Sequence, residues 1–212
     1  VTTKVSKGDL HGLMKRVGNV YGELRSISNI EKAAEKAKKG KSRRKEVAAY
    51  YKNKDNLNHK LSLMLSEHKY KVSKSVVFEK VTRNGKVRKI NKLPFYPDRN
   101  VQHCVLNIMQ DKWIKSLTSD AYNCIPGRGI TSRNKVYNMS KKIKRAILLP
   151  ESVYYLKLDI KKFYESVDND ILALCYRHDC KDKELLWLLD EMNYSHKGLL
   201  IGSPDSQLLS HV

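Results

Sequence analysis

The sequence predicts an α+β fold, in which a mainly helical region with one β-hairpin packs on a small sheet. Three observations support this prediction. Apolar residues recur at helix spacing over most of the chain, they alternate on both sides of an Asn-Gly pair at residues 84–85, and a strand-like apolar run ends at Asp159. With 212 residues, 41% of them hydrophobic, the chain is long enough to bury a core.

The chain carries a large positive charge that is unevenly distributed. Its 42 Lys and Arg residues outnumber 22 Asp and Glu residues, which leaves a net charge of +20. Residues 1–150 hold the whole excess, and residues 151–212 are net acidic. This balance excludes a charge-neutral surface and indicates a polyanionic partner for the basic part and a metal-using centre in the acidic part. A lysine-rich surface that merely keeps the chain in solution is the alternative.

Neither a membrane segment nor a disulfide framework is expected. The chain has no run of about 18 apolar residues and no charged-then-apolar leader, so no membrane partner is predicted. Its cysteines, Cys104, Cys124, Cys175 and Cys180, lack disulfide-like spacing, which favours the reducing cytoplasm. Cys175 and Cys180 could bind zinc together with His178, but no fourth ligand is evident. Ordinary buried or surface cysteines are therefore favoured.

The helical region begins with a basic extension, residues 1–52. Its charged helical run, residues 29–51, places Lys and Glu side chains along solvated helix faces. A further helix is predicted over residues 53–67, because its apolar side chains share one face. These side chains are Leu57, Leu61, Met64 and Leu65.

A β-hairpin is predicted next, over residues 75–82 and 86–93. Both segments alternate, and the Asn-Gly pair at residues 84–85 suits a type I′ turn, which needs positive φ at both central positions. The second strand places the cations Lys86 and Arg88 on one face. A solvated hairpin and a hairpin that grips phosphate groups explain these charges equally well.

The chain then returns to helix. A long apolar helix is predicted over residues 100–117, mostly as core. A Gly-rich turn, residues 122–130, leads into a basic helix that ends near residue 147. The Gly-Arg-Gly of this turn would let the backbone approach a phosphate, which alone is a weak signal. Residues 53–150 form the second predicted unit and residues 151–212 the third.

In the third unit, residues 153–160 predict a buried strand that ends in Asp159, and helices are predicted from Asp168 and over residues 182–192. A carboxylate at the end of an apolar strand is costly to desolvate unless it is paired, caps a turn or binds a cation. Mg²⁺ takes one or two carboxylates plus phosphate oxygens. Asp159 is therefore the candidate metal ligand, and a turn cap is the alternative.

Four ordered motifs over residues 76–212 resemble those of reverse transcriptases. Residues 158–167, Leu-Asp-Ile-Lys-Lys-Phe-Tyr-Glu-Ser-Val, resemble motif A. Arg-Lys-Ile at residues 88–90, with residues 93–103, is similar to the fingers motif and the helix after it. Residues 122–130 resemble the Tyr…Gly-Arg-Gly-Ile element of bacterial members, and residues 198–207 resemble motif B.

The resemblance implies an RNA-directed DNA polymerase of the right-hand type. Residues 1–52 would be a basic helical extension, residues 53–150 the mainly helical fingers with their hairpin, and residues 151–212 an incomplete palm sheet. The partners would be an RNA template with its primer and a dNTP, and the cofactor would be Mg²⁺ in a two-metal nucleotidyl transfer. The motif C that supplies further carboxylates is expected after motif B, so one aspartate would hold the ions poorly and this chain is not expected to polymerise unaided. Three nearby carboxylates could substitute for it, although a role as a helix cap or a place in the turn of motif B is favoured: Asp168, Asp170 and Asp205.

Carried over by position, the resemblance also implies a role for each site residue. Asp159 would be the catalytic, metal-binding aspartate, with the Ile160 carbonyl beside it. Tyr164 would be the aromatic gate against a ribose 2′-OH, and the amides of Lys162 and Phe163 would lie along the phosphates. Arg88 would bind the triphosphate, with Lys86 or Lys80 as the second cation. The remaining nucleotide contacts would be Ile201, Gly202 and Gln207, and the nucleic-acid contacts Arg99, Arg128, Lys142 and Arg145.

The sequence of motif B differs between subfamilies of reverse transcriptases. Residues 201–207, Ile-Gly-Ser-Pro-Asp-Ser-Gln, resemble the diversity-generating retroelement enzymes, whereas group II intron and retron enzymes usually have Gln-Gly-x-x-x-Ser-Pro here. An Ile beside the nascent pair offers shape but no hydrogen bond, which would loosen base selection. This subfamily also implies a small basic accessory protein. The alternatives are a group II intron or retron type of enzyme and a non-catalytic RNA-binding module.

Overall fold

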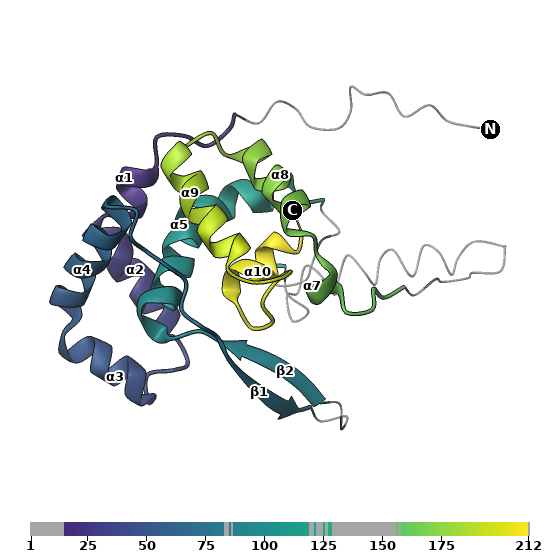
Figure 1. Cartoon of the computed structure of the whole chain (residues 1–212), viewed down its shortest axis with the longest axis horizontal. Helices are drawn as coiled ribbons and strands as arrows, with labels where there is room; N and C mark the ends of the chain where they lie inside the picture. Colours follow the sequence, from purple (N-terminus) through teal and green to yellow (C-terminus); the bar gives the residue numbers. More distant parts are fainter. Residues whose placement is uncertain are drawn as a thin grey trace.

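The computed structural model describes residues 15–82, 85, 87–118, 121, 125, 127–128, 156 and 158–211. These residues form helices and one two-stranded antiparallel sheet, which confirms a mixed helix-and-strand fold (Figure 1). The first helices are α1 (Tyr21–Leu24), α2 (Ile27–Lys38), α3 (Lys45–Lys52) and α4 (Lys54–Ser66). After the hairpin come the π-helical turn η1 (Phe95–Arg99), α5 (Asn100–Ser116), α7 (Phe163–Ser166), α8 (Asn169–Asp179), α9 (Lys183–Tyr194) and α10 (Pro204–Leu209).

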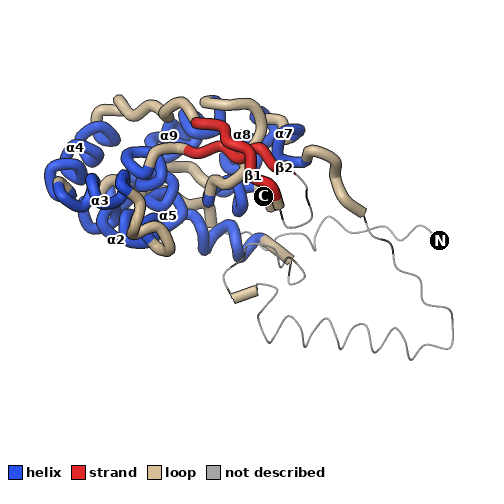
Figure 2. Tube along the Cα trace, turned by 90° about the horizontal axis from the view of Figure 1, so that it is seen from below, coloured by secondary structure: helices blue, strands red, loops and turns tan. Residues whose placement is uncertain are grey.

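The predicted hairpin is confirmed, as β1 (Val76–Val81) and β2 (Val87–Lys92). Val81 pairs with Val87 beside the turn, and Val76 pairs with Lys92 at the base. Gly85 has the positive φ, 73°, that the Asn-Gly turn requires. The hairpin extends away from the helices in Figure 1, and Figure 2 shows its strands running side by side.

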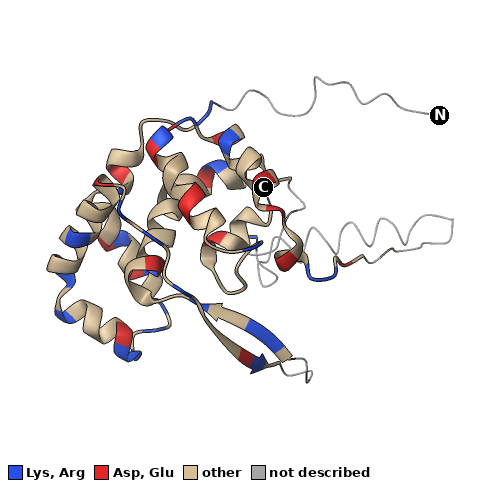
Figure 3. Ribbon diagram, in the orientation of Figure 1, with Lys and Arg blue, Asp and Glu red and all other residues tan. Residues whose placement is uncertain are grey.

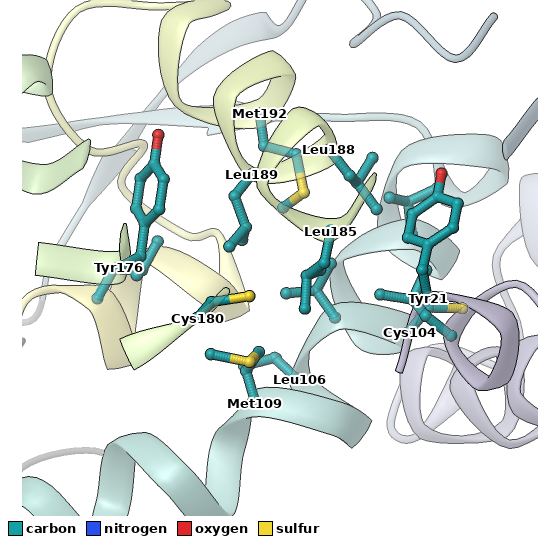
Figure 4. Packing of buried hydrophobic residues seen from close by; sticks show 14 of the residues in the cluster. Tyr21, Cys104, Leu106, Met109, Tyr176, Cys180, Leu185, Leu188, Leu189 and Met192 are labelled. Carbon is teal, nitrogen blue, oxygen red and sulfur yellow. The ribbon is translucent and has the colours of Figure 1, made fainter. Parts of the chain in front are cut away.

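Helix α5 is at the centre of the core. Its buried positions lie on more than one side of the helix, and Val101, Val105, Met109 and Trp113 are fully buried. The main cluster of buried side chains draws on α1, α2, α4, α5, α8, α9 and α10 (Figure 4). The described parts of the three predicted units therefore share one core.

Asp182 connects the start of α1 with the start of α9, because its carboxylate caps both helices. Its Oδ1 accepts from the amides of Glu184 and Leu185, in the first turn of α9, at 3.2 Å each. Its Oδ2 accepts from the amides of Val20 (2.7 Å) and Tyr21 (3.0 Å), where α1 begins. One buried carboxylate thus satisfies four backbone donors that would otherwise lack partners.

Two sequence-based predictions are wrong. The helical run over residues 29–51 is divided between α2 and α3, because Gly40 adopts a φ of 71° in the turn between them. The described residues of the predicted buried strand, residues 153–160, form no strand, and Leu158 and Ile160 are 80% and 64% exposed. The predicted basic helix after residue 130 lies outside the described residues. Over the described part of the chain, the helices are too short or too polar to cross a membrane.

Candidate nucleotide site

The loop of residues 198–203 connects the hairpin to the α7 turn. The Asn91 amide on β2 donates to the Ile201 carbonyl at 3.3 Å, and the Leu199 amide donates to the Tyr164 carbonyl at 2.7 Å. A Cβ atom built on Gly202 would lie 3.1 Å from Cγ2 of Ile90, so the loop also packs closely on β2. Three segments that are far apart in the sequence therefore meet at this loop, which we call the bridging loop.

Arg99 holds the bridging loop against the helical core. Its Nη2 donates to the Gly202 carbonyl at 2.8 Å, and its Nη1 donates to Oε1 of Gln102 at 3.2 Å. Gln102 in turn donates to the Ser203 hydroxyl at 2.5 Å, and that hydroxyl donates to Asp205 at 2.5 Å. Arg99, expected from the sequence to contact nucleic acid, thus has a structural contact with the loop as well.

Gly198 sets the separation between the bridging loop and α7. Its φ is +68°, and an added Cβ would lie 2.4 Å from the backbone oxygen of Tyr164, well inside van der Waals contact. We expect Gly198→Ala to lower the free energy of unfolding by about 2–3 kcal/mol, because it combines left-handed strain with a backbone clash. Urea unfolding measures this effect.

Gly40→Ala is the matched control. Gly40 has nearly the same φ, +71°, but a Cβ there would meet nothing within 4 Å. This control therefore isolates the backbone strain, about 1–2 kcal/mol. Equal destabilisation by the two substitutions would show that the approach of residue 198 to Tyr164 imposes no constraint.

The hairpin presents two cations side by side. Lys80 on β1 lies directly opposite Arg88 on β2, and both side chains are exposed. Like charges directly opposite each other destabilise a strand pair unless an anion neutralises them. On the other face, Glu79 opposes Lys89, an ordinary complementary pair. The register therefore identifies Lys80 as the partner of Arg88 among the described residues, whereas Lys86 lies outside them.

Asp159 lies in the segment that leads into α7, and α7 is joined to the bridging loop through Tyr164. Asp159 is exposed, and Lys162 starts α7 in the left-handed region, with a φ of 53°. The half-buried rings of Phe163 and Tyr164 meet edge to face, with centroids 5.7 Å apart. The Ile160 carbonyl is the second oxygen that the resemblance to reverse transcriptases assigns to a metal.

The three carboxylates named above as possible further metal ligands already accept hydrogen bonds. Asp168 caps α8 by accepting from the amides of Asp170 (2.8 Å) and Ile171 (3.1 Å). Asp170 accepts from the Tyr194 hydroxyl, and Asp205 accepts from Ser203. Across the described ranges, no three His, Cys, Asp or Glu side chains form a group that could hold a metal ion. Binding of Mg²⁺ at Asp159 therefore stays a prediction.

The other predicted site residues are scattered. Gln207 is exposed on α10. Arg128 donates through Nη1 to the carbonyls of Thr118 (2.9 Å) and Ala121 (3.5 Å), which occupies part of its guanidinium group. Lys142 and Arg145 lie outside the described residues, and so does Cys124.

Sequence reasoning missed two cations, Lys41 and Arg44, in the turn between α2 and α3. They line a groove together with the hairpin and Gly202. The signal was the basic run at residues 41–45 directly after Gly40, which was interpreted as part of a solvated helix. No protein-family model matches the chain, and no curated protein is significantly similar to it.

Proposed function

We propose that this chain forms the fingers and the first part of the palm of an RNA-directed DNA polymerase of a bacterial or phage retroelement. The observation that supports this best is the bridging loop, which is hydrogen-bonded to both β2 and α7. It brings together the three segments that resemble the fingers motif, motif A and motif B. Three motifs that bind one substrate must lie close together in the fold, whereas accidental matches need not. Their meeting at one loop therefore favours a functional origin over chance similarity.

The roles of the residues follow from their positions around this loop. Arg88 and Lys80 neutralise the triphosphate, because they are adjacent exposed cations on one hairpin face. The Tyr164 ring lies beside the sugar and limits the space at its 2′ position. The Ile201 side chain offers shape to the nascent base pair, without a hydrogen bond. When Mg²⁺ is bound, it neutralises phosphate charge and polarises the reacting groups.

Primer extension by the full-length gene product on an RNA template tests the proposal. Incorporation of dNTPs that requires both template and Mg²⁺ supports it. RNA binding without extension would overturn the enzymatic proposal and favour the non-catalytic RNA-binding module instead.

The ring of Tyr164 gives a sharper prediction. We expect Tyr164→Ala to lower the discrimination between a dNTP and the matching rNTP by about tenfold or more, because removal of the ring opens space for the 2′-OH. The measurement is the ratio of kcat/KM values for the two nucleotides. Tyr164→Phe keeps the ring and should retain the discrimination; a ratio unchanged in the alanine variant would contradict the gate.

A further inference from the structure

A groove of about 300 Å³ lies between the α2–α3 turn and the base of the hairpin. Its apolar lining includes Leu93 and Phe95, each 3% exposed, and Phe78, which is 43% exposed. Four cationic side chains line the same groove: Lys41, Arg44, Lys92 and Arg99. Figure 3 shows Lys and Arg positions on both the hairpin and the helices beside it.

The positive charge of this groove is only partly neutralised. Glu46 is the acidic residue among those that line it, and it pairs with both Lys92 (3.0 Å) and Arg44 (3.7 Å). Within the described ranges, Lys41 has no ion pair with a carboxylate, and Arg99 donates to Gly202 and Gln102. Among the residues that line the groove, one carboxylate therefore accompanies four cations, an imbalance that a bound anion would correct.

Burial is the main influence on the ionisation of three basic groups at or near the groove, and neighbouring cations add to it. Burial and the guanidinium groups of Arg99 and Arg44 lower the pKa of Lys41. Burial, together with Lys41, Arg99 and Lys36, lowers the pKa of His103 to about 4. Burial also lowers the pKa of Arg99; Arg44 adds to this shift, whereas Asp205 and Glu46 oppose it. Nearby cations thus add to the effect of burial at Lys41 and His103, whereas at Arg99 the nearby carboxylates oppose it.

We propose that this groove binds a nucleotide unit of a single nucleic-acid strand, with its phosphate on Lys41, Arg44 and Lys92 and its base against Phe78. A free inorganic anion would use the cations but not the apolar side of the groove. A strand supplies both phosphate and base at each unit, and exposed aromatic rings beside a cationic groove are typical of single-strand binding. The α2–α3 turn thereby becomes part of the nucleic-acid surface.

This inference rests on the proposed function in that both need a nucleic-acid strand, but a different assay tests each. The probe for the groove is a fluorescein-labelled single-stranded RNA of about 12 nucleotides, followed by fluorescence anisotropy over a series of salt concentrations. The combined variant Lys41→Gln and Arg44→Gln should bind it about tenfold more weakly, with a shallower salt dependence, because fewer phosphate contacts remain. Phe78→Ala should weaken binding roughly five- to tenfold without changing the salt dependence.

The matched control replaces Lys115 and Lys183 by Gln. Both are exposed, neither lines the groove, and the change in net charge is the same. Equal binding by the groove and control variants, with equal thermal unfolding midpoints, would overturn the inference. Titration of the groove variants with dTTP and with inorganic phosphate tests whether the groove instead binds a free nucleotide or a free phosphate. If the groove variants bound dTTP more weakly but bound RNA like the control, the assignment to a nucleic-acid strand would also be overturned.

The polymerase proposal fails separately. If the full-length product shows no extension but the groove variants still lose RNA affinity relative to the control, the groove inference stands and the enzymatic proposal does not. If extension occurs and the groove variants bind RNA like the control, the enzymatic proposal stands and the groove inference does not.

Discussion

Asp159→Asn in the full-length gene product should reduce primer extension by about 10³-fold or more. The substitution keeps the size of the side chain and removes its negative charge, which is the property that a magnesium ligand needs. Metal assistance to phosphoryl transfer is worth several kcal/mol, and about 1.4 kcal/mol corresponds to a tenfold change in rate. Because Asp159 is exposed, the fold should tolerate the change, and thermal unfolding midpoints should agree within error.

Asp111→Asn on α5 is the matched control. Asp111 is also exposed and loses the same charge, but it is separate from the bridging loop and α7. Extension by this variant should equal that of the wild-type protein. A similar loss in both variants would point to a general charge effect, and full activity of the Asp159 variant would exclude Asp159 from catalysis.

Asp182→Ala should destabilise the fold by about 3–5 kcal/mol. The carboxylate accepts four backbone hydrogen bonds at the starts of α1 and α9, and its removal leaves two buried and two partly buried donors unsatisfied. Urea unfolding followed by circular dichroism measures the loss. Asp168→Ala is the control, because Asp168 caps α8 alone in an exposed position and should cost only about 1 kcal/mol. Equal losses would contradict the double role of Asp182.

The same carboxylate makes stability depend on pH. Burial alone would raise the pKa of Asp182, but its four backbone donors, led by Leu185, hold the pKa below its ordinary value. A carboxyl group with a lowered pKa stabilises the fold above its unfolded pKa, near 4, and loses this contribution as pH falls through the folded value. The stability difference between wild type and Asp182→Ala should therefore shrink below about pH 4. A constant difference down to pH 2 would contradict this cause.

Much of the fold could be predicted because local signals agree with the packing. Helices were predicted from Asp168 and over residues 182–192, and α8 and α9 begin directly after Asp168 and Asp182, which cap them. The apolar spacing of residues 53–67 and 100–117 predicted α4 and α5 with their buried faces. The Asn-Gly pair predicted the hairpin, and Gly85 has the expected positive φ.

Other features depend on contacts that a sequence pattern does not record. Residues 153–160 have the composition of a strand, but a strand forms only where a neighbour supplies hydrogen bonds, and none of the described residues pairs with residues 158–160. The groove requires the α2–α3 turn to face β2, which depends on how α3 packs against η1. The predicted nucleotide contacts could be named individually from their motifs, whereas the bridging loop that connects them became visible only in three dimensions.

The attachment of the hairpin has a dynamic consequence. At its base, within the described part of the chain, the hairpin is joined to the body by the Asn91–Ile201 hydrogen bond and the Lys92–Glu46 ion pair, while Val77, Val81 and Val87 remain more than half exposed. Few buried contacts would be lost if it swung outward, so its amide protons should exchange with solvent through local opening, long before those of α5. A ligand that contacts both the hairpin and the body would oppose this opening. Slower hydrogen exchange in β1 and β2 would then report its arrival directly.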